Sequence, residues 1–598
     1  MSGQGGRFAE RWDRHGARLV RELGGLYGHL PGHAGFVAAV TAGLKARAID
    51  RPAPLVALDA AREADPAWFR APAMLGYSAY VDRFAGTLAG VADRIGYLEG
   101  LGVRYLHLLA LLKARAGDSD GGFAVADYLA VEPRLGDIAD LEALTARLRG
   151  AGISLCLDFA LNHTADDHEW AKRARAGDPA YRDFYIVLDD ADEVAARERE
   201  LSEVFPVTAP GNFTQVPGMG WVWTTFYPFQ WDLNWANPRL FATMLDTMLR
   251  LANHGVEAFR LDSIAFVWKQ AGTDSRNRPE GHAIVRALRA AVDIVAPGVL
   301  LKGEAIVPTR DVIPYFGTAD APECHLLYDN SLMVAGWTAL VEQSAQVPHA
   351  IQAETTRLPA AANWLTYARC HDDIGWGALL GDLVAFEAAP GLRLKAVAAV
   401  LEGGGFGRGE AFQVEGGGLH GTNGTMASLA GLESAGDDDD GAAAARAIAR
   451  IRLLNALMIA SGGLPTIYMG DEAAMLNDHG FRDDPLRAHE GRWLHRPAMD
   501  WDRPAGVAAT QVRGDLAALM RARVASGGTG PSEPWTTADD AVLGLKSGAD
   551  IVLINFADRE AAVDLPFGWA DRLGDATGAG GTDGAVVPPL GVLWCAPR

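Results

Sequence analysis

The spacing of hydrophobic and polar positions changes several times along the chain. Residues 1–73 place charged and apolar side chains at helical spacing, which predicts a helical N-terminal domain. From residue 74 onward, short apolar runs each end in polar residues, and a helical pattern follows each run. These apolar runs are 75–81, 103–109, 153–161, 256–264, 299–306, 325–328, 364–371 and 464–469.

Eight strand-helix units predict a single barrel. Near-continuous apolar strands that alternate with helices indicate a parallel sheet buried on both faces. Eight such units fit a (β/α)8 or TIM barrel, in which catalytic residues lie at the C-terminal ends of the strands. The expected fold class is therefore α/β: a TIM barrel with a helical N-terminal domain, two inserted domains and a C-terminal antiparallel β-sandwich.

Two connections in the barrel are too long for one strand-helix unit. The first is rich in aromatic residues and predicts an inserted domain over 164–238, and the second is rich in glycine and predicts an insertion over 375–445. Near the end of the chain, short alternating runs separated by turn residues predict the sandwich. The remaining expected boundaries are 1–73 for the helical domain, 74–163, 239–374 and 446–534 for the barrel, and 535–598 for the sandwich.

Charge and composition narrow the class of ligand. The net charge is −21, from 54 Lys and Arg against 75 Asp and Glu, which argues against nucleic acid or an anionic membrane as partner. The chain has no apolar run of about 18 residues and no apolar signal core at its start, so we expect a cytoplasmic protein. The four scattered cysteines show neither metal spacing nor a disulfide framework, which predicts free thiols.

Acidic residues follow several of the predicted strands. Arg260 and Asp262 are two positions apart on one strand, so both side chains point to the same face. A guanidinium beside a carboxylate keeps it ionised, as a nucleophile requires. Apolar surroundings and a nearby anion would raise the pKa of Glu304, which suits a general acid. With Asp372 after a later strand, these residues form a set that can cleave a glycosidic bond.

Each residue alone has a structural explanation. Arg260 and Asp262 could be an ordinary ion pair, Glu304 could pair with Lys302, and a lone His163 would more often be a satisfied core group. Four segments that occur together in a fixed order favour an active site instead. They are Asp158-Phe159-Ala160-Leu161-Asn162-His163, Gly255-Val256-Glu257-Ala258-Phe259-Arg260-Leu261-Asp262, Gly303-Glu304-Ala305 and Cys370-His371-Asp372-Asp373.

In order and wording these segments resemble the α-amylase superfamily of glycoside hydrolases. The resemblance implies that Asp262 is the nucleophile and that Glu304 is the general acid and base. It implies that Asp372 holds the 2- and 3-hydroxyls of the sugar and distorts its ring, and that His163 binds a sugar hydroxyl. Asp158 and Asn162 would order the strand end.

Within the superfamily, the chain is similar to the amylosucrases. The segments 119–125 and 491–497 carry Asp120 and Arg492, and in that subfamily the matching pair forms a salt bridge around one glucosyl unit. The resemblance places Phe226 and Gln230, in the aromatic stretch 221–234, at the fructosyl or acceptor site. At least half of the aromatic residues of that stretch are expected to form the core of the insertion. The expected substrate-binding residues are Asp120, Phe123, His163, Phe226, Gln230, Arg260, His371, Asp373, Gln413 and Arg492.

Three departures from the subfamily concern mainly the acceptor side. Phe123 stands where amylosucrases usually have Tyr, and Ser202 replaces an arginine that some members have. Residues 417–423 contain no arginine, where one that helps to bind the growing glucan is expected. Donor cleavage should survive these changes, whereas capture of a glucan acceptor would weaken.

The resemblance implies retaining glucosyl transfer from sucrose, which releases fructose and extends an α-1,4-glucan without a metal or organic cofactor. Sucrose hydrolysis on the same site and sucrose isomerisation are the alternatives. A non-catalytic carbohydrate-binding or scaffold protein is disfavoured, because Asp262, Glu304 and Asp372 are all present. The expected partners are sucrose and an α-glucan acceptor, with neither nucleic acid nor membrane, and the protein is expected to be a monomer or homodimer.

Overall fold

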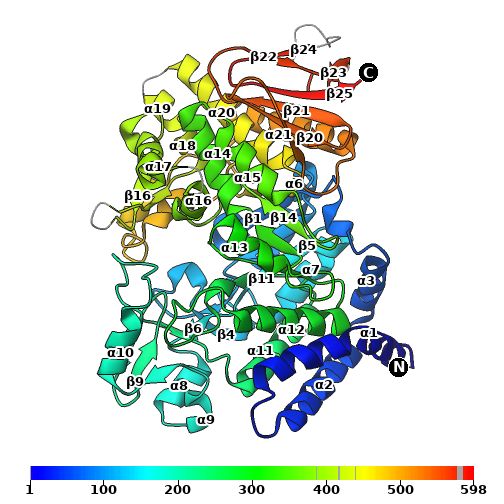
Figure 1. The fold of residues 1–598 in the computed structure, drawn as a ribbon, viewed down its shortest axis with the longest axis vertical. Coiled ribbons are helices and arrows are strands. Elements are labelled where there is room, and N and C mark those ends of the chain that lie inside the picture. Colours follow the sequence, from blue (N-terminus) through cyan, green and yellow to red (C-terminus); the bar gives the residue numbers. More distant parts are fainter. Residues whose placement is uncertain (1, 385–386, 415–417, 438–439, 567, 575–583) are drawn as a thin grey trace.

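Eight parallel strands form a closed barrel at the centre of the protein (Figure 1). The computed structural model describes residues 2–384, 387–414, 418–437, 440–566, 568–574 and 584–598. The barrel strands follow one another around the circle in sequence order, and all eight predicted strands are present. They are β1 (Gly76–Tyr80), β2 (Tyr105–Leu109), β5 (Ser154–Ala160), β11 (Ala258–Asp262), β12 (Leu300–Gly303), β13 (Leu326–Tyr328), β14 (Asn363–Thr366) and β18 (Leu464–Tyr468). The expected α/β barrel is confirmed.

The register of the strands places charged side chains in one layer inside the barrel. Arg260 on β11 pairs in register with Asp158 on β5 and with Lys302 on β12. All three side chains are buried, so each charge must be satisfied by its neighbours rather than by water. The barrel interior therefore holds an ionic layer directly beneath the C-terminal strand ends.

Several barrel strands end before their apolar runs do, and β14 does so by the largest margin. The apolar run 364–371 forms strand β14 only as far as Thr366, so Asp372 lies in the loop beyond it rather than at a strand end. The physical reason is that side-chain contacts hold this segment in place of ladder hydrogen bonds. Arg369, for example, donates to Asp471 at 3.0 Å and is buried.

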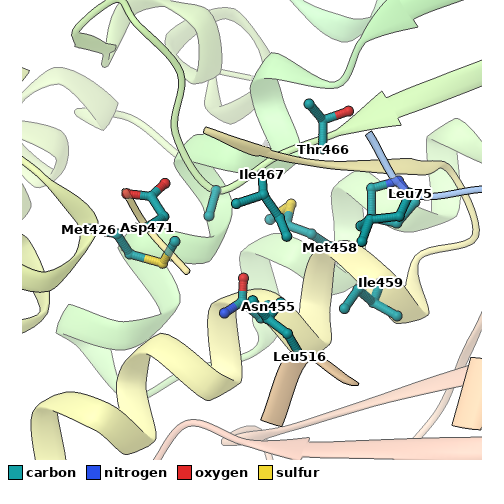
Figure 2. Close-up of a pocket in the computed structure, with 11 residues that line it drawn as sticks. Leu75, Met426, Asn455, Met458, Ile459, Thr466, Ile467, Asp471 and Leu516 are labelled. Carbon is teal, nitrogen blue, oxygen red and sulfur yellow. The ribbon is translucent and has the colours of Figure 1, made fainter. Parts of the chain in front are cut away.

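Helices surround the barrel, and a small cavity lies between strand β18 and two of these helices. They include α4 (Val81–Phe84), α5 (Leu88–Asp93), α6 (Ile95–Leu101), α7 (Ile138–Gly150), α11 (Pro238–Asn253), α12 (Pro279–Val295), α13 (Thr309–Val312), α14 (Asn330–Glu342), α15 (Gln346–Thr355), α20 (Gly441–Ala460) and α21 (Val507–Ser526). Figure 2 shows a cavity lined by Met458 of α20, Leu516 of α21 and Ile467 of β18. None of the predicted site residues lines it.

The N-terminal region is helical, as predicted. It comprises α1 (Ser2–Tyr27), α2 (His33–Asp50) and α3 (Ala53–Ala64), and Figure 1 shows α1 and α2 beside α12 and α11. Buried polar contacts fix it to the barrel: Tyr27 donates to the carbonyl oxygen of Trp235 at 2.9 Å, and Arg62 pairs with Glu257 at 2.6 Å. These helices therefore stabilise the end of the barrel from which strand β11 begins.

The two long connections form compact structure of their own. The first contains β6 (His163–Ala165), α8 (Glu169–Arg175), α9 (Pro179–Arg182), β7 (Val187–Leu188), α10 (Ala191–Glu198), β8 (Phe213–Val216), β9 (Gly220–Trp223) and β10 (Gln230–Asp232). The second contains β15 (Ile374–Gly375), α16 (Gly377–Leu383), α17 (Pro390–Ala399), β16 (Glu410–Phe412), β17 (Gly421–Asn423), α18 (Met426–Ala430) and α19 (Leu432–Asp437). Within the second, residues 385–386, 415–417 and 438–439 lie outside the described residues.

The chain ends in an additional β domain. Its strands are β19 (Glu533–Trp535), β20 (Val542–Ser547), β21 (Asp550–Asn555), β22 (Ala561–Asp564), β23 (Trp569–Asp571), β24 (Gly584–Val587) and β25 (Val592–Pro597). A five-stranded antiparallel sheet and the pair β22–β24 share one apolar core that includes Leu553, Val563 and Val587. Packing of two antiparallel sheets on a common core is the arrangement expected of a small sandwich.

Two smaller observations bear on the setting of the protein. All four cysteines are free thiols, as predicted. Among the helices that the structure describes, none is both long and apolar enough to cross a membrane.

Candidate active site

A buried guanidinium joins three carboxylates at the C-terminal end of the barrel. Nη1 of Arg260 lies 2.5 Å from Oδ1 of Asp262 and 3.0 Å from Oδ1 of Asp158. Nη2 lies 3.2 Å from Oε1 of Glu304. The Arg260 side chain is only 2% exposed, and its neighbours raise the pKa of its guanidinium although burial opposes them. One permanent cation therefore holds both predicted catalytic carboxyls next to each other.

Ser263 links the same two carboxyl groups a second time. Its backbone N–H donates to Oε2 of Glu304 at 2.8 Å, and its hydroxyl donates to Oδ2 of Asp262 at 3.0 Å. The sequence analysis did not single out Ser263, whose only signal is its position next to Asp262. The alternative in which Glu304 pairs with Lys302 is wrong: Nζ of Lys302 lies 3.2 Å from Nδ1 of His107 inside the barrel.

The environment of Glu304 favours its protonated form. Burial raises the pKa of this carboxyl to about 7, and the negative charges of Asp262 and Asp372 add to the increase, while Arg260 opposes it. In the case of Asp158, burial is outweighed by the nearby His107 and Arg260, so the pKa falls well below its ordinary value. Neighbouring carboxyls thus have pKa values that are far apart, which is typical of acid–base sites.

Asp372 contacts the imidazole of His371 and the guanidinium of Arg492. Its Oδ2 is 3.2 Å from Nε2 of His371, and its Oδ1 is 3.1 Å from Nη1 of Arg492. The ring of Phe123 stacks on His371 with centroids 5.3 Å apart, and Nε2 of His163 lies 3.3 Å from the carbonyl oxygen of Phe123. Burial and the charge of Arg260 keep the pKa of His371 well below its ordinary value, which favours a neutral imidazole.

An ion pair closes one side of this group. Nη2 of Arg492 lies 2.7 Å from Oδ1 of Asp120, and Gln230 donates to Oδ2 of Asp120 at 3.2 Å. Glu490 also accepts from Arg492 at 2.9 Å. Burial opposes ionisation of Glu490, but the charge of Arg492 lowers its pKa to about 2. The Asp120–Arg492 contact was expected; Glu490 was missed, although it lies two residues before Arg492.

The remaining predicted substrate-binding residues occupy different surroundings. Phe226 packs edge-to-face against His163, at 5.4 Å between ring centroids. Burial raises the pKa of Asp373 to about 6; Arg492 opposes this increase, while Asp372 adds to it. The amide of Gln413 instead forms hydrogen bonds with Val207 and Thr208 of the first insertion. Of the aromatic residues in 221–234, half are buried: Trp223, Tyr227 and Trp231.

Contacts connect most of the predicted residues into one network. The network contains Arg260, Asp262, Glu304, Phe123, His163, His371, Asp372, Arg492, Asp120, Gln230 and Phe226. The exposed fractions of the three central carboxylate side chains are 9% for Asp262, 13% for Glu304 and 22% for Asp372. All three carboxylates are therefore largely shielded from solvent.

A buried ammonium ties the first insertion to the barrel. Nζ of Lys269 lies 2.7 Å from Oδ2 of Asp232 and donates to Oδ1 of Asn162 and to the hydroxyl of Thr225, each at 3.0 Å. Asp232 is fully buried, and burial lowers the pKa of Lys269 while Asp232 opposes that decrease. Asn162, expected to order the strand end, thus accepts a hydrogen bond from this lysine.

One group in the described part of the chain has the geometry to hold a metal ion: Cys370, His371 and Asp372. Its chemistry does not favour a cation. Asp372 already faces the guanidinium of Arg492, and that of Arg496 lies 3.8 Å away. Burial, with a further contribution from Asp372, raises the pKa of the Cys370 thiol to about 12, so the thiolate ligand is disfavoured.

Comparison with known proteins identifies the protein family of this chain. The family model described as alpha amylase, catalytic domain, matches residues 59–403, more than half of the chain. The chain belongs to the α-amylase catalytic-domain family. The match includes the nucleophile, acid and Asp372 positions expected from the sequence, whereas Arg492 lies beyond it.

Relatives within the α-amylase family carry several names. The chain is 32% identical over 293 residues to trehalose synthase/amylase TreS of Mycolicibacterium smegmatis, which covers 48% of each protein. It is 33% identical over 271 residues to glucosylglycerate phosphorylase of Escherichia coli, which covers 45% of this chain and 46% of that protein. The chain thus spans about half the length of these curated relatives.

Solved structures of this family share the fold. The crystal structure of sucrose 6F-phosphate phosphorylase from Thermoanaerobacter thermosaccharolyticum superposes with a TM-score of 0.64 at 19% identity, over 81% of this chain and 93% of that one. An α-amylase from H. orenii gives a TM-score of 0.62 at 17% identity, over 88% and 99%. At this level of identity the likeness concerns the architecture alone.

The lysine that joins barrel and insertion can be tested by mutation. Lys269→Met leaves the Asp232 carboxylate buried without its cation, so we expect a loss of about 3–5 kcal/mol in the free energy of unfolding. Urea unfolding followed by tryptophan fluorescence measures it, because Trp223 and Trp231 are buried in the insertion. Lys546→Met is the matched control: the Lys546 side chain is 45% exposed, and we expect a change within about 0.5 kcal/mol. Equal stability of the two variants would contradict the assignment.

Proposed function

We propose that the protein is a retaining enzyme that transfers the α-glucosyl unit of sucrose. The observation that supports this most directly is the Asp120–Arg492 ion pair, which lies beside Asp372 and is itself only 12% and 7% exposed. In the amylosucrases the matching pair walls off a single glucosyl unit, so the ion pair supports a small donor over a threading polymer. A buried ion pair can select by shape even where it adds little stability.

In the first half of the reaction, Asp262 attacks the anomeric carbon of the glucosyl unit. Glu304 donates its proton to the fructosyl oxygen, the glycosidic bond breaks, and fructose leaves. The electron pair of the broken bond stays with fructose, and a β-glucosyl ester of Asp262 remains. Arg260 holds Asp262 in place through the contact at 2.5 Å, while the pKa of Glu304 at about 7 supports a proton donor.

In the second half, Glu304 has become a carboxylate and acts as a base. It removes the proton from the 4-hydroxyl of a glucan acceptor or from water, and the oxygen attacks the anomeric carbon. The ester bond to Asp262 breaks, and the product regains the α configuration after two inversions. Transfer extends an α-1,4-glucan, and hydrolysis releases glucose.

The remaining pocket residues are assigned to sugar binding. Phe123 offers its ring to the apolar face of the glucosyl unit, without the phenolic hydroxyl that amylosucrases usually have there. His163, His371 and Asp372 offer polar atoms to the ring hydroxyls, and Arg260 orients the carboxylates beneath. On the leaving-group side, Phe226 and Gln230 are assigned to the fructosyl unit, with Asp373 at the rim.

Sucrose hydrolysis is the second candidate, and one observation favours it. Residues 418–423 contain no arginine to bind a growing glucan, and Gly421 lies directly against Asp373. A Cβ atom on residue 421 would be 1.9 Å from Oδ2 of Asp373, so the carboxylate occupies the space that a side chain would need. Without a cation there, a glucan competes less well with water for the glucosyl ester. Sucrose isomerisation remains a minor alternative, in which fructose is recaptured at another hydroxyl.

The first test is incubation of the purified protein with sucrose alone. We expect fructose in excess of glucose, with short α-1,4-linked glucans among the products, because transfer keeps glucosyl units out of the free glucose pool. Equal fructose and glucose would identify a hydrolase, and a new disaccharide would identify an isomerase. Asp262→Asn is the control for contaminating activity. Parallel incubations with trehalose, and with sucrose plus phosphate, address the activities that the names of the relatives suggest; turnover of trehalose without turnover of sucrose would overturn the proposal.

The acid–base role of Glu304 predicts an alkaline limb in the pH profile of activity. Activity falls as the pH rises through about 7, because the folded enzyme then loses the proton that fructose needs. Glu304→Gln should lower kcat/KM for sucrose roughly 10²–10⁴-fold and remove this limb. With α-glucosyl fluoride, whose leaving group needs little protonation, the formation of the ester should be far less affected. A limb that persists in the variant would assign the acid to another residue.

A further inference from the structure

A glutamine side chain joins the two insertions. Oε1 of Gln413 accepts from the backbone N–H of Val207 at 3.1 Å and from that of Thr208 at 3.4 Å, and its Nε2 donates to the hydroxyl of Thr208 at 2.8 Å. Val207 and Thr208 belong to the first insertion, and Gln413 directly follows β16 in the second. We call this contact the Gln413 clasp. Both insertions lie on the same side of the barrel in Figure 1.

The residues beside the clasp cover the Arg492 wall. The rings of Phe205, from the first insertion, and Phe412, from the second, each lie 5.4 Å from Cζ of Arg492. Phe205 also lies 5.0 Å from the ring of Tyr227, whose hydroxyl donates to Glu490 at 3.1 Å. The segments that the clasp joins therefore carry the two rings that enclose the wall of the donor pocket.

The backbone at Gln413 is held in an uncommon conformation. Its φ is 58°, in the left-handed region that residues other than glycine seldom adopt unless surrounding contacts fix them. The three hydrogen bonds to the opposite loop supply such contacts. These hydrogen bonds occupy both the oxygen and the nitrogen of the amide. A sugar hydroxyl would therefore have to displace one of them in order to bind Gln413.

We propose that the Gln413 clasp limits the length of the acceptor that can reach the glucosyl ester. The proposal rests on the proposed function and specifies its acceptor class: short saccharides and water rather than long α-glucans. With the clasp closed, Phe205 and Phe412 stay over Arg492, and a chain several sugars long lacks the passage between the insertions. Gln413 is thus a positioning residue, and it acts through the two loops rather than on the sugar.

The test is acceptor partition in Gln413→Ala. The protein is supplied with sucrose plus maltose or plus maltoheptaose, and transfer products and free glucose are quantified. We expect the ratio of transfer to hydrolysis with maltoheptaose to rise at least about threefold, and the KM for maltoheptaose to fall, while donor consumption without acceptor changes less than about twofold. A general loss of structure would lower all rates together and leave this ratio unchanged.

Two matched variants make the test specific. Gln413→Glu keeps an acceptor for both N–H groups and for the Thr208 hydroxyl, so it should retain the partition of the unmutated protein. Gln346→Ala removes a glutamine that donates to Asp540 at 2.9 Å, on a helix outside the pocket, and should change nothing. An unchanged ratio in Gln413→Ala, or Gln413→Glu behaving like Gln413→Ala, would overturn the proposal.

A second donor separates the two proposals. α-Glucosyl fluoride can load Asp262 without a fructosyl site, so acceptor partition is measurable with it even if sucrose is not a substrate. Turnover of the fluoride without release of fructose from sucrose would reject the proposed donor, and the effect of Gln413→Ala would still decide the clasp. Lack of turnover with either donor would overturn both.

Discussion

The contact on which this site depends is the shared guanidinium of Arg260. Three carboxylates converge at the end of the barrel, and in a buried setting three like charges cannot coexist without a compensating cation. Arg260 binds all three, most closely Asp262 at 2.5 Å and least closely Glu304 at 3.2 Å. One cation thus contacts the proposed nucleophile and the proposed acid at the same time. A lysine would supply one ammonium point charge and could not reproduce the two-nitrogen fork.

The barrel supplies the reacting groups, and the insertions determine the shape of the pocket. Arg492 is a second buried cation that binds several carboxylates: Asp120, Asp372 and Glu490. Lys269 is a third buried cation, and it binds Asp232 at the junction of barrel and insertion. Each cation fixes groups from segments far apart in the sequence, so each position depends on the fold as a whole. Family membership alone leaves the substrate open, because one barrel can host many specificities through its loops.

How far the sequence predicts this structure depends on the range of the interactions. The eight barrel strands and the pair Arg260–Asp262 follow from local apolar periodicity and from two-residue spacing. Glu490 and Phe205 carry no such signal, because their roles arise from contacts with residues distant in the chain. Strand β14 shows the same limit: its apolar run continues to residue 371, but the pairing of Arg369 with Asp471 removes the later residues from the sheet. Local pattern predicts elements, whereas side-chain contacts of long range decide where they end.

In the proposed reaction, the balance between transfer and hydrolysis depends on what lies above the glucosyl ester. Asp262 and Glu304 would serve both outcomes equally, because the same base deprotonates a sugar hydroxyl and water. The choice between water and a glucan must therefore depend on which of them can reach the glucosyl ester and on how well the acceptor is bound. Gly421 beside Asp373 offers no cation to a glucan, and Gln413 gives its amide to the opposite loop instead of to a sugar. Both features lie in the second insertion, so acceptor choice can change there without altering the ionic centre that breaks the bond.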